Sequence, residues 1–431
     1  MLSVFRDSWT LLLGLLLLML GNGLQGTLLG VRGALEGMTP GALSVVMSAY
    51  FLGLLIGARV TPLMIRRVGH VRVFAALASM ISAGFILYAA LPDPWVWAAT
   101  RLVVGFCFCG VYIVAESWLN ERATNETRGQ AMSAYMLVQM VGIVSAQGLM
   151  TLADPGGYAL FVLISVLVSL SVTPMLLSVS PAPAFDAAKR MSLRRLMQVS
   201  PLGCVGVFLL GGVFSAMFGM AAVYGALAGL TVPQISALVA AMYAGGLVTQ
   251  WPMGWLSDRI DRRRLIVGLC LAGFAASALA ALGPAYPVLL LLAAVVGGSV
   301  NPLYSVLIAH TNDFLEPSDM ASASGGLLFL NGVGAVGGPL AVGLLMERLG
   351  PGAFFLQMGG LMGLIALYGL WRMTRRPAKP AVETGAHIAV LPSASPVAVE
   401  IATGIAAEIS AELAADGQPA DAEDRPRAET A

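Results

Sequence analysis

Three charged side chains fall inside long apolar stretches of the sequence, namely Arg59, Arg101 and Glu116. A charge in such surroundings is costly, so it indicates a function unless a partner neutralises it. Removal from water favours the neutral form of a carboxyl group, and Glu116 could therefore bind and release a proton near neutral pH. A permanent ion pair between Glu116 and Arg59 is the structural alternative. Arg101, about 22 Å from Glu116 along the same helix, either joins this proton chemistry or extends to the nearer surface.

The composition indicates that lipid surrounds these stretches. The chain of 431 residues is 58% hydrophobic and 11% charged, with a mean hydropathy of +0.83, whereas a soluble domain carries about 25% charged residues. The net charge of +1 gives no reason to expect nucleic acid as a partner. Cys107, Cys109, Cys204 and Cys270 all fall in apolar runs, so neither a disulfide framework nor a metal site is expected. No cofactor is expected either.

Twelve apolar runs are long enough to cross a bilayer, which takes about 20 residues of helix. Backbone groups in lipid must pair within one segment, and because the runs do not alternate as barrel strands would, helices are expected. The predicted fold class is an all-α integral membrane protein with twelve transmembrane helices. The first run is interpreted as a membrane helix rather than a cleaved signal peptide. The expected helices cover residues 9–31, 41–64, 73–92, 95–119, 129–152, 157–178, 202–229, 233–256, 265–283, 286–311, 320–346 and 352–372.

Basic residues are distributed unevenly between the loops. If both ends of the chain lie in the cytoplasm, thirteen Arg and Lys residues fall in cytoplasmic loops, and only Arg32 and Arg348 fall on the opposite side. This asymmetry predicts cytoplasmic N- and C-termini in a bacterial cytoplasmic (inner) membrane. The thirteen are Arg66, Arg67, Arg72, Arg122, Arg128, Lys189, Arg190, Arg194, Arg195, Arg259, Arg262, Arg263 and Arg264.

Residues recur at a spacing of 192 positions, which indicates that one half of the chain duplicates the other. Chance matches of glycine are common in a chain with 50 glycines, but a matched asparagine followed by a matched acid is harder to dismiss. The pairs are Gly37 with Gly229, Thr39 with Thr231, Gly105 with Gly297, Asn120 with Asn312 and Glu121 with Asp313.

The duplication divides the chain into four parts. We expect an N-terminal six-helix bundle (1–178), a cytoplasmic linker (179–201), a C-terminal six-helix bundle (202–372) and a cytoplasmic tail (373–431). The tail is rich in Ala, Pro and Glu, which favours disorder. The alternative is one short amphipathic helix, because an apolar residue recurs every four positions from Ile401 to Leu413.

Gly254 to Arg264 reads GWLSDRIDRRR, a short charged turn between two apolar runs. It resembles the loop signature of the major facilitator superfamily of secondary transporters, and IRRVGHVR from Ile65 is a degraded first copy. The run R-x-x-x-G-x-x-x-x-G from Arg101 resembles the fourth-helix signature of the same superfamily. AESWLNERA from Ala115, with RGQAMSAYM and LYSVLIAHTNDFLEP further on, is similar to the YcaD-like branch, and the resemblance covers about residues 5–372.

The resemblance implies two pseudo-symmetric six-helix bundles around a central cavity that helices 1, 4, 7 and 10 face. Polar residues on these helices, with Gln139 on helix 5, are then candidates for the transport cavity, although an interhelical hydrogen bond would explain any single one. The signature arginine lies near the proton-coupling region of the superfamily, so Glu116, Arg101 and Arg59 are candidates for proton coupling. The cavity candidates are Asn22, Gln25, Tyr112, Glu116, Gln139, Tyr224, Asn301 and Tyr304.

In the same superfamily, acidic residues at the cytoplasmic ends of helices 4 and 10 pair with loop arginines and hold that side closed. Asp258 would cap a helix of the other half, where the helix dipole favours a negative charge. The alternative is that the arginines only set the topology. The gating candidates are Glu121 with Arg67 or Arg72, Asp313 with Arg259 or Arg264, and Gly69, Gly254 and Asp258.

We therefore expect a secondary active transporter that moves a small organic solute by alternating access, coupled to protons. Sparse charge in the expected cavity favours a neutral or weakly polar solute. A non-transporting membrane receptor or scaffold that retains the fold is the alternative. An enzyme is not expected, because the three histidines lie apart and offer no convergent acid–base set. The expected partners are the solute, protons and the lipid bilayer, and the chain is expected to be a monomer.

Overall fold

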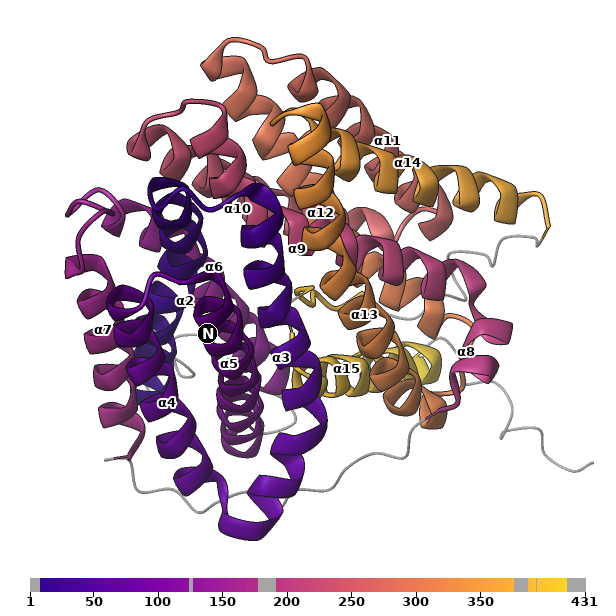
Figure 1. The fold of residues 1–431 in the computed structure, drawn as a ribbon. Helices are drawn as coiled ribbons and strands as arrows, with labels where there is room; N and C mark the ends of the chain where they lie inside the picture. The colour runs from indigo at the N-terminus through magenta and orange to yellow at the C-terminus, as the bar shows by residue number, and fades with distance from the viewer. Residues whose placement is uncertain (1–7, 124–126, 177–190, 376–386, 393, 417–431) are drawn as a thin grey trace, which may run out of the picture.

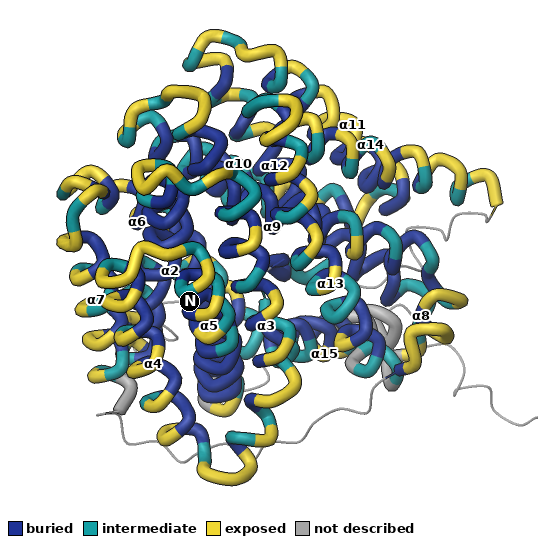
Figure 2. Tube along the Cα trace, viewed as in Figure 1, coloured by how far each residue is buried: buried dark blue, intermediate teal, exposed yellow. Residues whose placement is uncertain are grey.

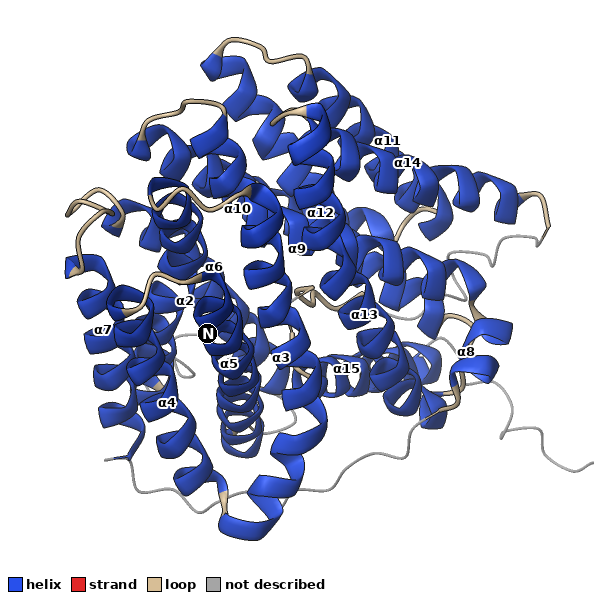
Figure 3. Cartoon of the chain, viewed as in Figure 1, coloured by secondary structure: helices blue, strands red, loops and turns tan. Residues whose placement is uncertain are grey.

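The computed structural model describes residues 8–123, 127–176, 191–375, 387–392 and 394–416, and the regular elements within these ranges are all helices (Figure 3). Helices α2–α7 and α9–α14 follow the twelve expected runs, and α8 and α15 are additional. Eleven of the described helices are long and apolar enough to cross a bilayer, and α7 is shorter over its described residues. The helices are α2 (Trp9–Leu35), α3 (Pro40–Val68), α4 (His70–Ala90), α5 (Pro94–Arg122), α6 (Arg128–Leu149), α7 (Ala159–Leu176), α8 (Leu193–Val199), α9 (Pro201–Leu227), α10 (Val232–Ser257), α11 (Arg262–Ala281), α12 (Tyr286–Asn312), α13 (Pro317–Leu349), α14 (Ala353–Met373) and α15 (Pro396–Asp416).

Equivalent residues begin the second helix of each half. Gly37 and Gly229 have φ angles of +72° and +73°, a conformation that glycine adopts without strain. Two residues later, Thr39 and Thr231 precede α3 and α10, and each helix has a proline in its first turn. The Thr39 hydroxyl accepts a hydrogen bond from the backbone N–H of Ala42 at 3.2 Å. The repeat of 192 residues therefore appears in the local structure as well as in the sequence.

The closest helix crossings also repeat with this spacing. A Cβ atom added to Gly105 in α5 would lie 2.1 Å from the carbonyl oxygen of Tyr50 in α3. A Cβ atom added to Gly297 in α12 would lie 1.8 Å from the carbonyl oxygen of Met242 in α10. Both distances are far shorter than van der Waals contact, so only glycine lets these backbones approach so closely. The two six-helix bundles therefore share one packing scheme.

Four helices form the interior of the molecule, and they are the four that the family resemblance places at the centre. Within their apolar spans, 78–83% of the residues of α2, α5, α9 and α12 are buried, against 39–50% in the other seven spanning helices. Figure 2 shows the same division, with exposed residues following the outer faces of helices such as α4, α7, α11 and α14. The interior helices are thus positioned to hold polar side chains away from lipid.

The two halves contact each other mainly through α2 with α9, α3 with α13 and α6 with α10. We call the end of the bundle that carries Arg67 in the last turn of α3 and Arg259 just after α10 the basic end. At the opposite end, the Ser48 hydroxyl of α3 donates a hydrogen bond to the carbonyl oxygen of Val336 in α13. Near that end, α2 and α9 pack so closely that a Cβ atom on Gly30 would lie 2.8 Å from the Cβ of Ala222.

The tail differs from the disordered segment that its composition predicts. Residues 387–392 lie between the halves at the basic end, and α15 packs against α13, α5 and α6 (Figure 1). The alternative of a single helix is therefore correct for Pro396–Asp416, although the side chains of Ile409 and Leu413 lie outside the described residues. The rest of the tail beyond Arg375, together with most of the expected linker, also lies outside them. The linker contains α8, which was not expected.

Candidate solute site

Arg101 is fully buried and belongs to a polar network within the first half. Its guanidinium group donates a hydrogen bond to Gln25 Oε1 at 2.6 Å and lies over the ring of Tyr50, 4.5 Å from the centroid. Gln25 in turn donates to Asn22 Oδ1, and Asn22 Nδ2 donates to the Tyr112 hydroxyl at 2.7 Å. Among the described residues, Arg101 has no carboxylate partner and its Nε has no hydrogen-bond acceptor. Arg101 therefore lies in the interior and does not extend to the surface.

Glu116 lies on the same helix, nearer the basic end, and is 1% exposed. Its carboxylate accepts a hydrogen bond from the Tyr135 hydroxyl of α6, and Gln139 Nε2 donates to that hydroxyl at 2.7 Å. The expected alternative partner, Arg59, lies on an exposed face of α3 with its guanidinium 4.7 Å from the ring centroid of Phe329. The Glu116–Arg59 ion pair is therefore not formed, and Arg59 is not brought to this site.

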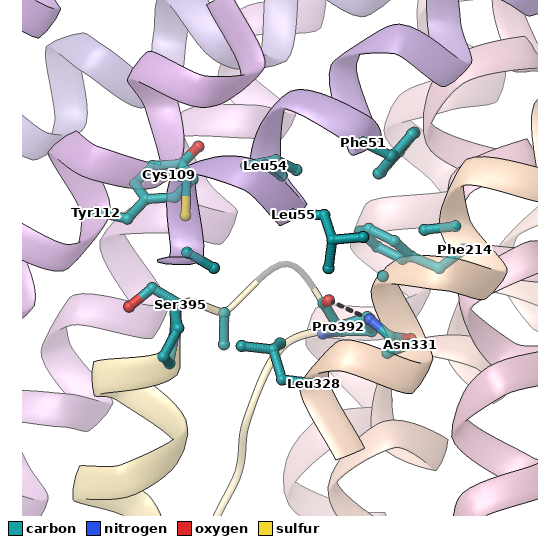
Figure 4. Close-up of a pocket in the computed structure, with 15 residues that line it drawn as sticks. Phe51, Leu54, Leu55, Cys109, Tyr112, Phe214, Leu328, Asn331, Pro392 and Ser395 are labelled. Atoms are coloured by element: carbon teal, nitrogen blue, oxygen red, sulfur yellow. Dashed lines mark hydrogen bonds between the residues drawn. The ribbon is translucent and has the colours of Figure 1, made fainter. Parts of the chain in front are cut away.

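Two small adjoining cavities lie between the halves, with volumes of about 60 and 20 Å³. Both are lined by Phe51, Leu54 and Tyr112 of the first half and by Phe214 of the second. The larger one, shown in Figure 4, also has Cys109, Asn331 and tail residues 392 and 394–396 in its wall. The smaller one is lined further by Met19, Asn22, Tyr50, Gln139, Met140, Ile143, Phe218, Tyr243, Asn301 and Leu391.

The structure brings five of the eight cavity candidates together. Asn22, Tyr112, Gln139 and Asn301 line the smaller cavity, and Glu116 reaches its edge through its hydrogen bond with Tyr135 and that of Tyr135 with Gln139. Gln25 lies behind Asn22 and connects it to Arg101, so it supports the wall without forming it.

Tyr224 and Tyr304 do not line either cavity. Tyr224 stacks on Phe354 of α14, with ring centroids 5.2 Å apart, and packs edge-on against Phe355. Tyr304 is fully buried, and its hydroxyl has no hydrogen-bond partner among the described residues. Both were expected at the cavity because of their helices, but α14 of the same half covers the face of α9 on which Tyr224 lies.

Several aromatic residues of the cavity wall were missing from the candidate set. Tyr50 contributes both a ring under Arg101 and a hydroxyl that donates to Asn22 Oδ1 at 3.2 Å. Phe218 of α9 stacks on Tyr50, with centroids 5.8 Å apart, and lies edge-on to Tyr243 of α10. Phe218 gave no signal in the sequence, because aromatic residues in membrane helices are common packing residues.

The acids and arginines of the basic end have partners other than the expected ones. Asp313 pairs with buried Arg262, instead of Arg259 or Arg264, and the Arg259 guanidinium lies over the ring of Trp255 at 4.1 Å. In the first half, exposed Glu121 forms no ion pair with Arg67 or Arg72, which are also exposed. The expected latch pairs are therefore absent from this conformation. Gly69, at the corresponding turn of the first half, has a φ of +83° between α3 and α4.

Asp258 contacts the tail and does not cap a helix of the other half. Its carboxylate accepts a hydrogen bond from the backbone N–H of His387 at 3.0 Å and one from Arg262 at 3.4 Å. The His387 ring lies against Gly254 in the turn signature. Burial lowers the pKa of His387 to about 4, while nearby Asp258 acts to raise it and Arg262 to lower it. The turn signature therefore positions the tail in this conformation.

The opposite end has a hydrogen bond between the halves that the sequence did not reveal. Glu347, near the end of α13, accepts a hydrogen bond from the backbone N–H of Gly41 in the first turn of α3 at 2.8 Å. The carboxylate of one half thus caps a helix of the other half, at the helix end where the dipole favours a negative charge. The halves are joined at this end, while the basic end holds the tail between them.

Comparisons with known proteins agree with this architecture. The chain is 28% identical over 382 residues to the uncharacterised MFS-type transporter YcaD of several Escherichia coli strains, a match that covers 87% of this chain and 98% of the relative. Among solved structures it is similar to the nucleoside transporter NupG, in a mutant form (TM-score 0.74, 13% identity, 84% of this chain and 98% of that one) and without that mutation (TM-score 0.67, 14% identity, 85% and 99%). At these identities the structural likeness shows the fold alone. A sequence profile of the Major Facilitator Superfamily matches residues 11–231 and 202–407, and the chain therefore belongs to this superfamily of membrane transporters.

Proposed function

We propose that the chain is a secondary active transporter that moves a small organic solute between its two halves by alternating access, with protons as the coupling ion. One observation carries the proposal. Glu116 is a buried carboxyl group at the seam between the halves, hydrogen-bonded to Tyr135 and beside cavities that both halves line. A carboxyl group in this position can change its protonation when the interface between the halves opens to water and closes again.

The side chains of the cavity wall favour a neutral or weakly polar solute that contains an aromatic ring. Tyr50, Tyr112 and Phe218 contribute aromatic surface to the wall, and Asn22 and Gln139 contribute amide groups. A single guanidinium group, Arg101, lies behind this wall and could orient a polar substituent through Asn22 and Tyr112. Nucleosides have this mixed character, and because NupG, a solved protein of similar fold, is a nucleoside transporter, they are the first solutes to test.

In the proposed cycle, Glu116 exchanges its proton with the aqueous phase on the side of the membrane to which the interface between the halves is open. The hydrogen bond from Tyr135 supports the carboxylate form, and Gln139 fixes the position of the Tyr135 hydroxyl. Closure of the interface between the halves removes water from Glu116, which favours the neutral acid. Proton uptake and closure therefore favour each other, and this linkage couples a proton gradient to solute movement.

The basic end is the cytoplasmic end in this proposal, because loops rich in arginine remain on the cytoplasmic side. The contact between Glu347 and Gly41 supports a conformation closed on the opposite side. When the basic end closes instead, Glu121 and Asp313 at the ends of α5 and α12 pair with loop arginines, as the family resemblance implies. In this proposal, the pairs expected among the gating candidates therefore form in the other conformation of the cycle.

Solute flux into proteoliposomes tests the proposed function. The purified full chain is reconstituted, a pH gradient is imposed across the membrane, and uptake of radiolabelled nucleosides and other neutral aromatic solutes is measured. We expect uptake of at least one solute that exceeds the leak into protein-free liposomes and that a protonophore abolishes. Absence of flux for every solute class, in either direction of the gradient, would favour a receptor or scaffold that retains the fold.

A further inference from the structure

The tail makes a set of buried contacts with the candidate solute site that the transport cycle itself does not require. The Ser395 hydroxyl donates a hydrogen bond to Glu116, and the backbone N–H of Ala398 donates to the same carboxylate oxygen at 3.1 Å. Ser395 also accepts from the N–H of Val397 at 3.1 Å and so caps α15. Glu116 satisfies a further N–H of the first turn, where the helix dipole favours its negative charge. The carboxylate of the site therefore acts as a cap for the tail helix.

The second half holds the tail by backbone contacts. Ser305 of α12 both donates to the carbonyl oxygen of Val390 at 2.9 Å and accepts from its N–H at 3.0 Å. Asn331 of α13 donates to the carbonyl oxygen of Pro392 at 3.0 Å, a contact visible beside the cavity in Figure 4. Glu116 belongs to the first half, so the same segment is attached to both halves. A link of this kind opposes any motion that changes their relative position.

Apolar burial adds to these hydrogen bonds. Leu391 enters the wall of the smaller cavity, and Val390 beside it is buried. On α15, Val399 and Ala402 are 0% and 2% exposed, and Ile405 is also buried. Removal of these apolar side chains from water stabilises the contact. The face of α15 that carries these residues is therefore held against the bundle.

The space left in the site is too small for an organic solute. The cavities of about 60 and 20 Å³ beside the tail compare with the roughly 300–1,000 Å³ of small-molecule sites. A groove of about 560 Å³ between α6 and α10 has tail residues 387–389 and Leu391 in its wall. The tail thus lies where a solute would pass between the basic end and Glu116.

We propose that residues 387–392 and 394–408 form a tail plug, an autoinhibitory segment that occupies the basic-end entrance of the solute site and must leave before the carrier can turn over. This inference rests on the proposed function for its consequence in transport, whereas the position of the tail plug can be tested without transport. Release of the tail plug frees Glu116 for proton exchange, opens the entrance and removes the link between the halves.

The native cysteine Cys109 reports the position of the tail plug. It lines the same cavity as Ser395 and Pro396 and is 4% exposed while they are in place. Full-length protein in membranes is treated with N-ethylmaleimide from the basic end, and modification of Cys109 is followed by mass spectrometry. Ala402→Asp places a charge on the buried face of α15. Gly404→Asp is the matched control, because Gly404 is exposed and no atom lies within 4 Å of an added Cβ.

We expect Cys109 in Ala402→Asp to react at least about tenfold faster than in the wild type, because burying an unpaired carboxylate costs more than the ~1.4 kcal/mol that a tenfold change requires. Gly404→Asp should react at the wild-type rate. Val399→Asp provides a second release variant, and a synthetic peptide of residues 387–408 added to either release variant should slow the reaction again. Equal rates in the wild type and both release variants, whether fast or slow, would overturn the tail plug.

The two proposals fail in distinguishable ways. In proteoliposomes, release variants should take up solute faster than the wild type and Gly404→Asp. If Cys109 reacts as expected but no variant transports any solute, the proposed function fails and the tail plug stands. If pH-driven uptake is found but Cys109 reactivity and uptake are the same in all variants, the tail plug fails and the proposed function stands.

Discussion

Replacement of Gly297 by alanine tests the packing on which both halves depend. An added Cβ would lie 1.8 Å from the carbonyl oxygen of Met242, whereas ordinary contact begins at 3.4 Å, so α10 and α12 must separate by about 1.5 Å or bend. Overpacking of this kind costs up to about 3 kcal/mol, whereas alanine gains only ~1 kcal/mol over glycine in a helix. The net effect is a loss of stability, with a fall in melting temperature of about 2 °C or more.

The measurement is thermal unfolding of purified full-length protein in detergent, followed by the loss of the monodisperse peak in size-exclusion chromatography. Gly105→Ala, the equivalent change in the first half, should show a fall of similar size, because its Cβ would lie 2.1 Å from a carbonyl oxygen of α3. Gly337→Ala in α13 is the control, since nothing lies within 4 Å of its Cβ, and it should be neutral or stabilising. Equal melting temperatures for Gly297→Ala and Gly337→Ala would refute the close crossing.

Three further predictions concern the ends of the molecule and its polar core. Glu347→Gln should weaken the exposed hydrogen bond between Glu347 and Gly41 at the opposite end by about 0.5–1 kcal/mol, and it should raise the reactivity of engineered cysteines there by roughly two- to fivefold. Unchanged reactivity would show that this hydrogen bond does not help to hold that end closed. Arg101→Lys should lower uptake at least about tenfold, because an ammonium group does not reproduce the planar stacking on Tyr50, and wild-type uptake would contradict this. Because burial lowers the pKa of His387 from 6.5 to about 4, the released tail binds a proton that the docked tail does not, and docking weakens as the pH falls from 6.5 towards 4. The thiolate is the reactive form of cysteine, so the Cys109 rate is expressed at each pH relative to that of the release variant Ala402→Asp, which undergoes the same loss of thiolate. This relative rate should rise roughly tenfold from pH 7 to pH 5 in the wild type but not in His387→Asn, and the same pH response in both proteins would show that His387 is not responsible.

The helices and their duplication could be predicted from the sequence because the bilayer leaves few choices. Apolar runs of about 20 residues must form helices in lipid, and the spacing of 192 residues placed Gly105 and Gly297 at equivalent sites before their contacts were known. The burial of α2, α5, α9 and α12 follows the arrangement that the family resemblance implies. These features depend on residue type and spacing, which the sequence displays directly.

The partners of Glu116 could not be predicted in the same way. Its depth in the bilayer indicated a functional carboxyl group, but Ser395 lies 279 positions away and gives no signal of its own in the sequence. The composition of the tail predicted disorder because few of its residues are large and apolar. Its helix is held by contacts with α5, α6 and α13, and such tertiary contacts override local propensity.

The gating pairs illustrate a second limit, which is that in the proposed cycle one sequence serves two conformations. The resemblance implies latch pairs that form when the basic end is closed, while the structure has the tail between the halves at this end. Asp313 accordingly pairs with Arg262 of its own half, and Asp258 accepts the N–H of His387. One of the contacts between the halves at the opposite end is made by Glu347, an exposed residue near a helix end that no pattern in the sequence distinguishes from an ordinary surface acid.

The central claim is that one buried carboxyl group, Glu116, couples protons to solute movement between two rocking halves. The most direct test compares Glu116→Gln with the wild type in proteoliposomes, measuring uptake driven by a pH gradient and solute exchange at equal pH on both sides. Glu36→Gln, a change in an exposed carboxylate that pairs with Arg32, is the matched control. We expect Glu116→Gln to lose pH-driven uptake and retain exchange, with Glu36→Gln unchanged in both. Full pH-driven uptake by Glu116→Gln would contradict the account.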